Sequence, residues 1–189
     1  MLEAAFFDRP AAVVARELLG AHITSLCGGE STAAIVVETE AYPGPEDPAC
    51  HAAERIGRTA RNAPLYGPPG TAYIHMNYGI HWLMNAVTGP EGFPAAVLIR
   101  AAEPIGGLDV MRARRGRSEL TSGPARLTAA LAVGPEIQGH RLDGPPLWLS
   151  AGEPVPEDEV VVTRRVGISR AVDRPLRFYD RRSTWISKR

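Results

Sequence analysis

The sequence predicts an α+β fold in which a few helices are added to an antiparallel, barrel-like sheet. Segments with strand character occur in clusters, whereas a doubly wound fold needs strands and helices that alternate along the chain. The chain has 189 residues, 44% of them hydrophobic, and its sequence contains neither an internal repeat nor a linker-like segment. This length suffices for one core and falls short of two, so we expect a single domain over residues 1–189.

The first part of the chain is expected to form a helix and then enter the sheet. Residues 9–19 have the pattern of an amphipathic helix, with Val13 among the apolar residues that face inward. Residues 33–37 form an apolar run that is typical of a buried strand, and this strand continues to Tyr42.

A long loop and a hairpin follow. Residues 43–70 are rich in Pro, Gly and Arg and lack periodicity, which predicts an ordered, functional loop. Residues 71–85 predict a hairpin with its tip near residues 77–79, and we expect Ser122 to cap a later helix. The remaining expected elements are strands near 95–100, 147–150, 159–169 and 176–180, and helices near 106–115 and 123–133.

Two carboxylates and an aromatic ring fall on one face of the expected strand. Side chains of a strand alternate between its faces. Residues 36, 38, 40 and 42 (Val36, Glu38, Glu40 and Tyr42) therefore point one way, while Ile35, Val37 and Thr39 point the other. A carboxylate at the edge of an apolar strand is costly unless it has a partner or a chemical task. The pattern therefore predicts general-base chemistry beside a flat substrate that stacks on the ring.

The two halves of the chain carry opposite net charge although the whole chain is neutral. Residues 1–110 contain six arginines and twelve carboxylates, whereas residues 111–189 contain fifteen basic and nine acidic residues. Such asymmetry is typical of a basic face that binds a polyanion. A solvated, arginine-rich surface without a partner is the equally weighted alternative.

Lysine and cysteine usage narrows the chemistry. Lys188 is the only lysine among 21 basic residues, and arginine stays protonated at any useful pH. An imine mechanism that needs an internal lysine amine is therefore not expected. Cys27 and Cys50 are expected to be free thiols. The sequence has no apolar run long enough to cross a membrane and no signal-peptide pattern at its N-terminus, so we expect a cytoplasmic protein.

Short motifs are spread over nearly the whole chain in a fixed order. They are Glu38-Thr39-Glu40-Ala41-Tyr42, Gly44-Pro45-Glu46-Asp47 with His51, Arg61-Asn62, Pro69-Gly70-Thr71, Tyr78-Gly79 with Met84-Asn85, Leu98-Ile99-Arg100-Ala101-Ala102-Glu103-Pro104, Ser122-Gly123-Pro124, Arg165-Val166-Gly167 and Pro175-Leu176-Arg177-Phe178-Tyr179. Each motif alone is weakly specific, whereas the ordered set is strongly specific. The set resembles the alkyladenine (3-methyladenine) DNA glycosylase family.

The resemblance implies a monofunctional enzyme that hydrolyses the N-glycosidic bond of a damaged purine in double-stranded DNA. The damaged nucleotide is flipped out of the duplex, a glutamate activates the attacking water, and an abasic site is left for base excision repair without lyase cleavage of the strand. The resemblance also implies no metal, no cofactor and a monomer that is nucleoid-associated in a bacterium. The implied fold is an open Greek-key barrel, like a formyltransferase C-terminal domain, with added helices.

Three positions match catalytic residues of the family. Glu40 matches the general base for the water that attacks the anomeric carbon, where an oxocarbenium-like transition state develops positive charge. Arg100 matches the residue that holds this glutamate and the water, and the backbone carbonyl of Val166 matches a further contact to the water. Glu38 lies on the same face without a matching role, so we assign it a structural one.

Five positions match residues that surround the flipped base. Tyr42 matches a ring that stacks on the base, His51 matches a hydrogen-bond donor to it, and Asn85 matches the residue that crowds the 2-amino group of guanine. Two positions depart from the pattern, because His75 stands where some members carry a second aromatic wall and Ile80 stands where others carry a methionine. These departures bear on stacking and on the range of substrates.

Contacts to the DNA itself are expected at the hairpin tip and at the start of a helix. Tyr78, beside Gly79, matches the wedge that enters the minor groove and fills the space left by the flipped nucleotide. Ser122, Gly123 and Arg126 surround an expected helix N-terminus, which suits a phosphate of the DNA backbone.

Three other functions stay open at this point. A catalytically silent module of the same fold that binds damaged DNA would not need Glu40 and Arg100 together. A metal hydrolase would use Cys50 and the histidines, whose spacing fits no common zinc pattern. A glycosylase that also cuts the strand through an imine would need a lysine in the core.

Overall fold

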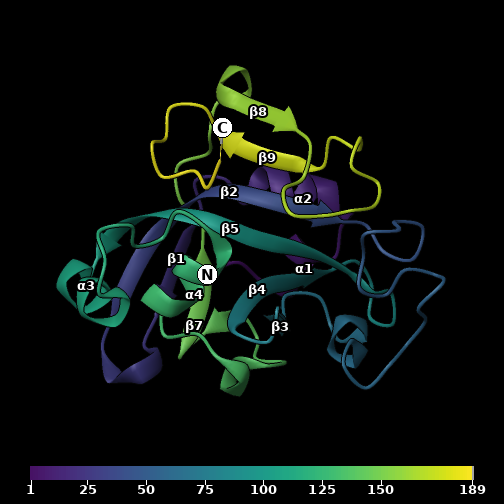
Figure 1. Ribbon diagram of the computed structural model, residues 1–189, viewed down its shortest axis with the longest axis horizontal. Helices are drawn as coiled ribbons and strands as arrows, with labels where there is room; N and C mark the ends of the chain where they lie inside the picture. The colour runs from purple at the N-terminus through teal and green to yellow at the C-terminus, as the bar shows by residue number, and fades with distance from the viewer. Residues whose placement is uncertain (189) are drawn as a thin grey trace.

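The computed structural model describes residues 1–188, which contain nine strands joined into one continuous sheet (Figure 1). Every pair of neighbouring strands in the sheet is antiparallel. The strands are β1 (His22–Ser25), β2 (Thr32–Tyr42), β3 (Ala72–Asn77), β4 (His81–Thr88), β5 (Ala95–Gly106), β6 (Asp143–Gly144), β7 (Leu147–Ser150), β8 (Val160–Thr163) and β9 (Arg177–Asp180).

The sheet curls into a half-barrel. Its order is β3-β4-β5-β2-β1-β7-β6, and the β8–β9 hairpin branches from β2. The two edges of this order approach each other, because Thr71 forms a bridge with Arg141 and the amide of Ala72 donates to the carbonyl of His140 at 2.8 Å. The predicted α+β class with an antiparallel, barrel-like sheet is confirmed.

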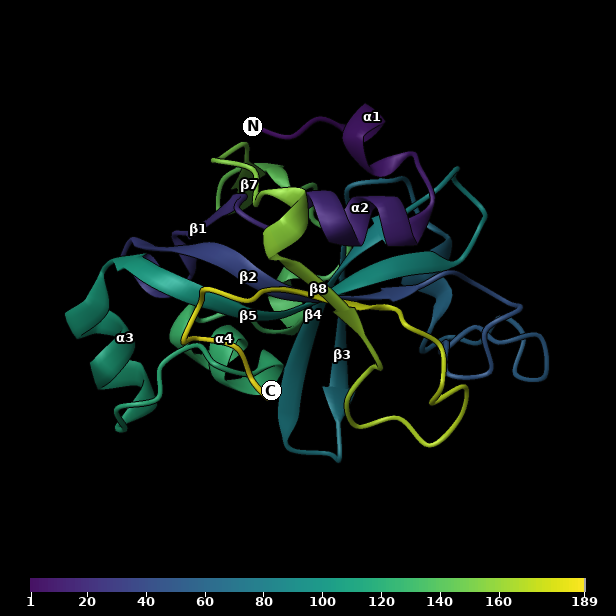
Figure 2. The ribbon, with the colours of Figure 1, turned by 90° about the horizontal axis from the view of Figure 1, so that it is seen from above.

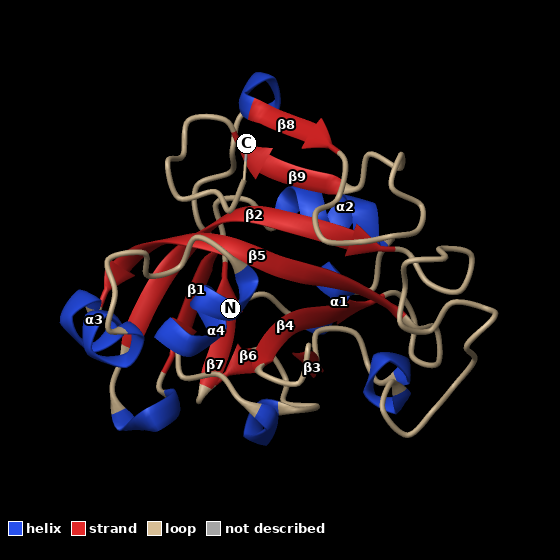
Figure 3. Cartoon of the chain, in the orientation of Figure 1, coloured by secondary structure: helices blue, strands red, loops and turns tan. Residues whose placement is uncertain are grey.

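Helices lie against this sheet and at one end of it (Figures 2 and 3). None of the helices in residues 1–188 is long and apolar enough to cross a membrane. The helices are α1 (Ala4–Phe7), α2 (Ala11–Glu17), α3 (Leu108–Arg115) and α4 (Pro124–Ala130), and single 3-10 turns cover Cys27–Gly29, Ala63–Tyr66, Pro135–Ile137 and Glu157–Glu159.

Three apolar clusters hold these layers together. The largest joins α1, α2 and α4 to the inner face of the sheet, with Val14, Leu18 and Leu127 fully buried. A second cluster lies under residues 43–70, and a third packs Ile186 of the C-terminal tail against β2 and β5. The second and third clusters flank the part of β2 that carries Glu38 and Glu40, and they therefore position the segments that cover this part of the sheet.

The first helical region differs from the prediction for residues 9–19. The chain forms two helices, and α2 begins only at Ala11, after Pro10. Val13 is 40% exposed instead of facing inward, because α2 turns Val14 and Leu18 toward the sheet. α2 ends at Glu17, two residues before the predicted end, and the chain turns into the sheet at Gly20, whose φ of 87° glycine adopts readily.

Two later elements are shorter than predicted. The strand expected over 159–169 ends at Thr163, because the next segment leaves the sheet and Arg165 turns inward to bind Asp47. The helix expected over 123–133 ends at Ala130, and Ser122 does not cap it. Gly123 occupies the N-cap position instead, and no side chain supplies a cap bond there.

Candidate active site

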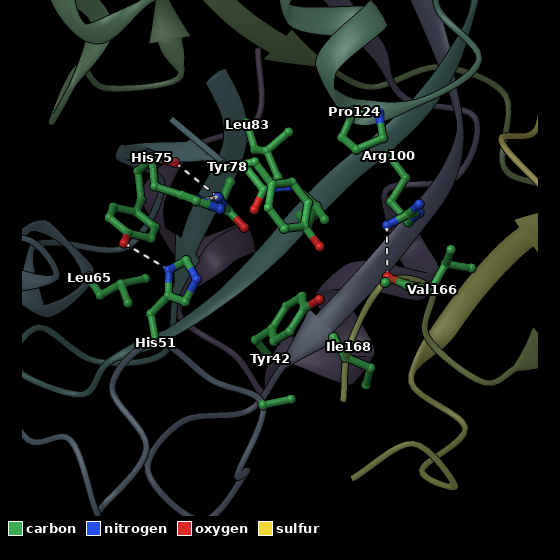
Figure 4. A pocket seen from close by; sticks show the side chains of 16 residues that line it. Tyr42, His51, Leu65, His75, Tyr78, Leu83, Arg100, Pro124, Val166 and Ile168 are labelled. Carbon is green, nitrogen blue, oxygen red and sulfur yellow. Dashed lines mark hydrogen bonds between the residues drawn. The ribbon is translucent and has the colours of Figure 1, made fainter. Parts of the chain in front are cut away.

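A cavity of about 230 Å³ opens between the β3–β4 hairpin, residues 43–70 and the segment that follows β8 (Figure 4). Its volume is several times the roughly 30 Å³ that one water takes up in the liquid, so it admits a small organic group. Its polar and aromatic lining includes Tyr42, His51, Tyr73, His75, Tyr78, Asn85 and Arg100, together with residues 166–168.

Glu40 lies directly behind the wall of this cavity. Its carboxylate has no exposed surface and accepts three polar contacts from residues that do line the cavity. The amide of Val166 donates to Oε1 at 2.6 Å, the hydroxyl of Tyr42 donates to Oε2 at 2.9 Å, and Nη1 of Arg100 lies 3.3 Å from Oε2. Three polar groups that border the cavity therefore contact the carboxylate directly.

Burial shifts the protonation of Glu40. Loss of hydration raises the pKa of this carboxyl above its ordinary value, and the nearby charge of Glu38 raises it further. Arg100, the Val166 amide and the Tyr42 hydroxyl each pull the pKa down without cancelling the effect of burial. A carboxylate with a raised pKa is a stronger base than one in water, which suits the removal of a proton from a water molecule.

Arg100 connects Glu40 to the second carboxylate of the strand. It comes from β5, and its Nε donates to Oε1 of Glu38 at 3.2 Å. Its Nη1 also points at the carbonyl oxygen of Val166, at 3.5 Å (Figure 4). That separation exceeds the usual range of N–H···O bonds, so this is the weakest contact in the wall.

Four residues form one wall of the cavity through direct contacts. Nδ1 of His51 lies 3.0 Å from the hydroxyl of Tyr73, and the rings of His51 and His75 meet edge to face at 4.3 Å between centroids. The side-chain amide nitrogen of Asn85 donates to the Tyr73 carbonyl at 3.1 Å and reaches Nδ1 of His75 at 3.2 Å. Because an amide nitrogen only donates, Nδ1 of His75 accepts, and the neutral ring carries its proton on Nε2.

Both histidines of this wall are held neutral. Burial, reinforced by His51 and Arg61, lowers the pKa of His75 to about 3. Burial and then Arg61 lower the pKa of His51 as well. The wall therefore presents uncharged rings to the cavity at neutral pH.

Tyr42 is held from behind by a buried ion pair. The guanidinium of Arg165 lies 4.7 Å from the centroid of the Tyr42 ring and donates to Asp47, while it also donates to the carbonyl of Ala41 at 3.0 Å. The side chains of Arg165 and Asp47 are both completely buried. This pair fixes the segment that carries Val166 against the end of β2, so it sets the position of two groups that touch Glu40.

The hairpin tip projects beyond the cavity. Tyr78 lines the rim, is 83% exposed and has a φ of 51°, which is unusual for a residue other than glycine. Ile80 is 72% exposed, and the structure does not bring it to the cavity wall. Of the two predicted residues at the tip, Tyr78 therefore lies at the exposed rim of the cavity, whereas Ile80 lies outside it.

The three predicted phosphate contacts line a second cavity on the far side of Arg100. Ser122, Gly123 and Arg126 border it, and α4 behind them has only seven residues. Nη1 of Arg126 folds back onto the carbonyl and hydroxyl oxygens of Ser122, at 3.0 and 3.2 Å. Lys188, the only lysine, also lines this cavity together with Arg100, although it is distant from Arg100 in the sequence.

Neither cysteine contributes to the site as a metal ligand. Cys27 and Cys50 are buried free thiols, as expected. Within residues 1–188, no three His, Cys, Asp or Glu side chains gather closely enough to hold a metal ion.

A family model described as methylpurine-DNA glycosylase matches residues 5–184. The chain belongs to the methylpurine-DNA glycosylase family. Its relatives carry provisional names as 3-methyladenine DNA glycosylases. The relative from Carboxydothermus hydrogenoformans is 43% identical over the full length of both chains. The relative from Gloeobacter violaceus is 45% identical over 97% of this chain and 85% of its own length. A third, from Anaeromyxobacter dehalogenans, is 46% identical over 99% of this chain and 86% of its own. The predicted family and enzyme class are confirmed.

Several residues that shape the site of this methylpurine-DNA glycosylase had no role in the sequence interpretation. Asp47, Arg165 and Arg177 lie in recognised motifs, but one sequence does not show which buried charges pair. Tyr73 lies two residues before His75 on β3, so the alternation of side chains along a strand is the signal that places both in one wall. Ser187 carried no signal, because it lies outside every motif and beyond the residues that the family model matches.

Proposed function

We propose that this methylpurine-DNA glycosylase hydrolyses the N-glycosidic bond of damaged purines in double-stranded DNA, with Glu40 as the general base. Water adds to the anomeric carbon, its proton passes to Glu40, and the bond to the purine nitrogen breaks with its electrons leaving on the base. A free purine and an abasic site result. The observation that carries this proposal is the Glu40 carboxylate, which has a raised pKa and sits one polar layer behind the cavity.

The attacking water needs a place beside Glu40. Each carboxylate oxygen accepts more than one hydrogen bond, so the existing donors leave room for a water. The 3.5 Å contact between Arg100 and the Val166 carbonyl is the weakest in the wall, and a water beside it would accept from Arg100 and donate to the carbonyl. This position would leave Arg100, Val166 and Glu40 around the nucleophile, which are the three residues expected to act on it.

The flipped base is proposed to bind between Tyr42 and the wall of His51 and His75. An alkylated purine is cationic, which makes it a good leaving group and favours contact with the faces of aromatic rings. Neutral imidazoles do not repel such a base, and the lowered pKa values of both histidines support this arrangement. Asn85 lines the same cavity, where it would oppose the 2-amino group of an undamaged guanine.

DNA is proposed to lie across the hairpin tip and the second cavity. Tyr78 would fill the gap left by the flipped nucleotide, and its exposed ring at the rim supports this role. Ile80 is exposed beside it, so we expect it to touch the duplex near the flipped base rather than to line the pocket. Ser122, Gly123 and Arg126 would contact a backbone phosphate, because the second cavity shares Arg100 and Pro124 with the first.

The test is release of free bases from duplexes that each carry one lesion, with 3-methyladenine, 7-methylguanine, hypoxanthine and etheno-adenine compared. Wild-type protein should release at least one of them, and Glu40→Gln should lose this activity while it still binds an abasic-site analogue. Normal turnover by Glu40→Gln would overturn the assignment of the base. Binding without release by the wild type would instead support a silent DNA-binding module.

Three further experiments test the proposed contacts to DNA and the absence of imine chemistry. Tyr78→Ser should slow release from duplex DNA more than from single strands, and Arg126→Ala should reduce the slope of log K against log salt by about one. Equal effects of Tyr78→Ser on both substrates would count against the wedge. Borohydride should trap no adduct between protein and DNA, whereas an adduct that disappears in Lys188→Ala would show imine chemistry.

A further inference from the structure

The C-terminal tail, the segment after β9, contacts the carboxylate of Glu38, which also binds Arg100. Glu38 is completely buried, and its oxygens accept from Nε of Arg177 at 2.7 Å and from Nε of Arg100 at 3.2 Å. The tail adds two more donors, since the amide of Ser187 reaches Oε2 at 2.5 Å and its hydroxyl reaches Oε1 at 2.8 Å. Two guanidinium groups and one serine thus saturate a single carboxylate.

The tail is fixed to the sheet independently of these bonds. Ile186 is buried against Val37 and Ala101, the residues that precede Glu38 on β2 and follow Arg100 on β5. Arg177 also donates to the carbonyl of Lys188. The apolar contact of Ile186 on one side and the hydrogen bond to the Lys188 carbonyl on the other therefore fix the position of Ser187 and its hydroxyl.

Arg100 has a different partner for each of its three nitrogens. Nε meets Glu38, Nη1 meets Glu40 at 3.3 Å, and Nη2 donates to the hydroxyl of Ser187 at 3.3 Å. A guanidinium is planar, so two fixed edges also fix the third. Arg100 and Ser187 both line the second cavity, so there is open space beside the guanidinium.

We propose that Ser187, acting together with Glu38, is a positioning residue that holds the Arg100 guanidinium against Glu40. The proposal rests on the proposed role of Glu40. Ser187 touches neither Glu40 nor the base cavity, so it acts only through Arg100. It lies beyond residues 5–184, the part of the chain that the family model matches.

The position of Arg100 controls the charge of Glu40. The ionisable groups that face Glu40 are Arg100 from β5, Glu38 and Tyr42 from β2, and Arg165 from the segment after β8. Arg100 is the strongest of the influences that lower the pKa of Glu40. If Arg100 moves away, this pKa rises, and the active carboxylate form is lost at a higher pH.

The experiment uses full-length Ser187→Ala, with Ser187→Thr to restore the hydroxyl. Ser183→Ala is the matched control, since Ser183 is a tail serine whose hydroxyl accepts from the amide of Trp185 and contacts no carboxylate. Single-turnover base release by Ser187→Ala should fall about tenfold at neutral pH, because hydrogen bonds in charged networks are among the stronger ones. The acid limb of its pH profile should move up by roughly half a unit, since a displaced cation stabilises the carboxylate less. Ser187→Thr and Ser183→Ala should behave like the wild type.

A second measurement does not depend on catalysis. A carbon-13 NMR titration of glutamate-labelled protein, with the Glu40 signal assigned through Glu40→Gln, should show a higher pKa for Glu40 in Ser187→Ala than in the wild type. An unchanged Glu40 pKa in Ser187→Ala would overturn the proposal, whether or not the protein releases bases. If the pKa shifts but no variant releases a base, the positioning role stands and the proposed reaction fails. Removal of residues 187–189 should give a larger shift in the same direction, and a smaller one would also contradict the proposal.

Discussion

Glu38 and Glu40 lie two residues apart on β2 and are both completely buried, yet their surroundings differ. Glu38 accepts from Arg177, from Arg100 and twice from Ser187, so charged donors surround it. Glu40 accepts from one amide and one hydroxyl and shares only the outer edge of Arg100. The partners of Glu40 all line the first cavity, whereas Arg100 is the one partner of Glu38 that does so.

The difference shows how one strand can supply a structural and a chemical carboxylate. A buried carboxylate that is fully paired holds its partners in fixed positions. A buried charge with neutral donors keeps a raised pKa and spare acceptor capacity, which is what a base needs. Neighbouring carboxylates in contrasting environments are a recurring arrangement in enzymes that move protons.

The largest expected effect is a difference in the free energy of unfolding between variants of Glu38 and of Glu40. Glu38→Gln should lower the free energy of unfolding by about 3 kcal/mol, because it leaves the buried Arg177 guanidinium without a counter-charge and removes one of the two carboxylates beside Arg100. Glu40→Gln should leave this free energy within about 1 kcal/mol of the wild type, because the amide oxygen still accepts from Val166. Urea denaturation at pH 7 measures both. Equal losses in the two variants would remove the distinction between them.

The pH dependence of the same measurement has a defined sign. The folded state raises the pKa of Glu40, so it binds this proton more tightly than the unfolded chain does. The contribution of Glu40 to stability therefore decreases as the pH rises from the unfolded pKa through the folded one. Any gain in stability of Glu40→Gln over the wild type should appear at pH 7 and vanish below about pH 4, where the carboxyl is protonated in both states.

An intermediate effect is expected from Arg100→Lys, which keeps the positive charge but loses the planar set of guanidinium donors. A lysine ammonium cannot bond Glu38, Glu40 and Ser187 in one fixed plane. We expect base release to slow by about thirtyfold, more than any loss of stability explains, since positioned catalytic contacts contribute factors of roughly 100 or more. Rates measured with unfolding controls at one temperature test this. A variant with reduced stability and an unchanged rate would show that Arg100 serves Glu38 alone.

The smallest effect is expected from the hydroxyl of Tyr42. Tyr42→Phe keeps the ring against Arg165 but removes the 2.9 Å bond to Glu40, so release should slow by about fivefold and the acid limb should move to higher pH. Tyr179→Phe is the matched control, because the Tyr179 ring packs on Arg177 beside Glu38. A comparable loss in Tyr179→Phe would mean that the Tyr42 bond has no special role.

Local patterns predicted most of the sheet and of the cavity. The alternation along β2 predicted that Glu38, Glu40 and Tyr42 share a face, and their contacts with Arg100 and with each other agree with this. Val36 does not share that face, because the register of β2 against β5 shifts around Glu38 and Val36 packs in the main core with Ala41. The 147–150 strand and the hairpin tip lie where the patterns indicated. The patterns were wrong where a distant partner overrode a local preference, as at Arg165, which ends β8 early by turning to Asp47.

The amino-acid order alone was enough to indicate the class of fold, the family and the strand that carries the proposed base, because periodicity and ordered motifs are local properties of a chain. The different surroundings of Glu38 and Glu40 could be determined only from the tertiary structure. It depends on Arg177, Ser187 and Val166, which lie more than 120 residues away along the chain. The protonation of a buried carboxylate is set by such neighbours in space and by its distance from water, and neither of these is written in the spacing of a sequence.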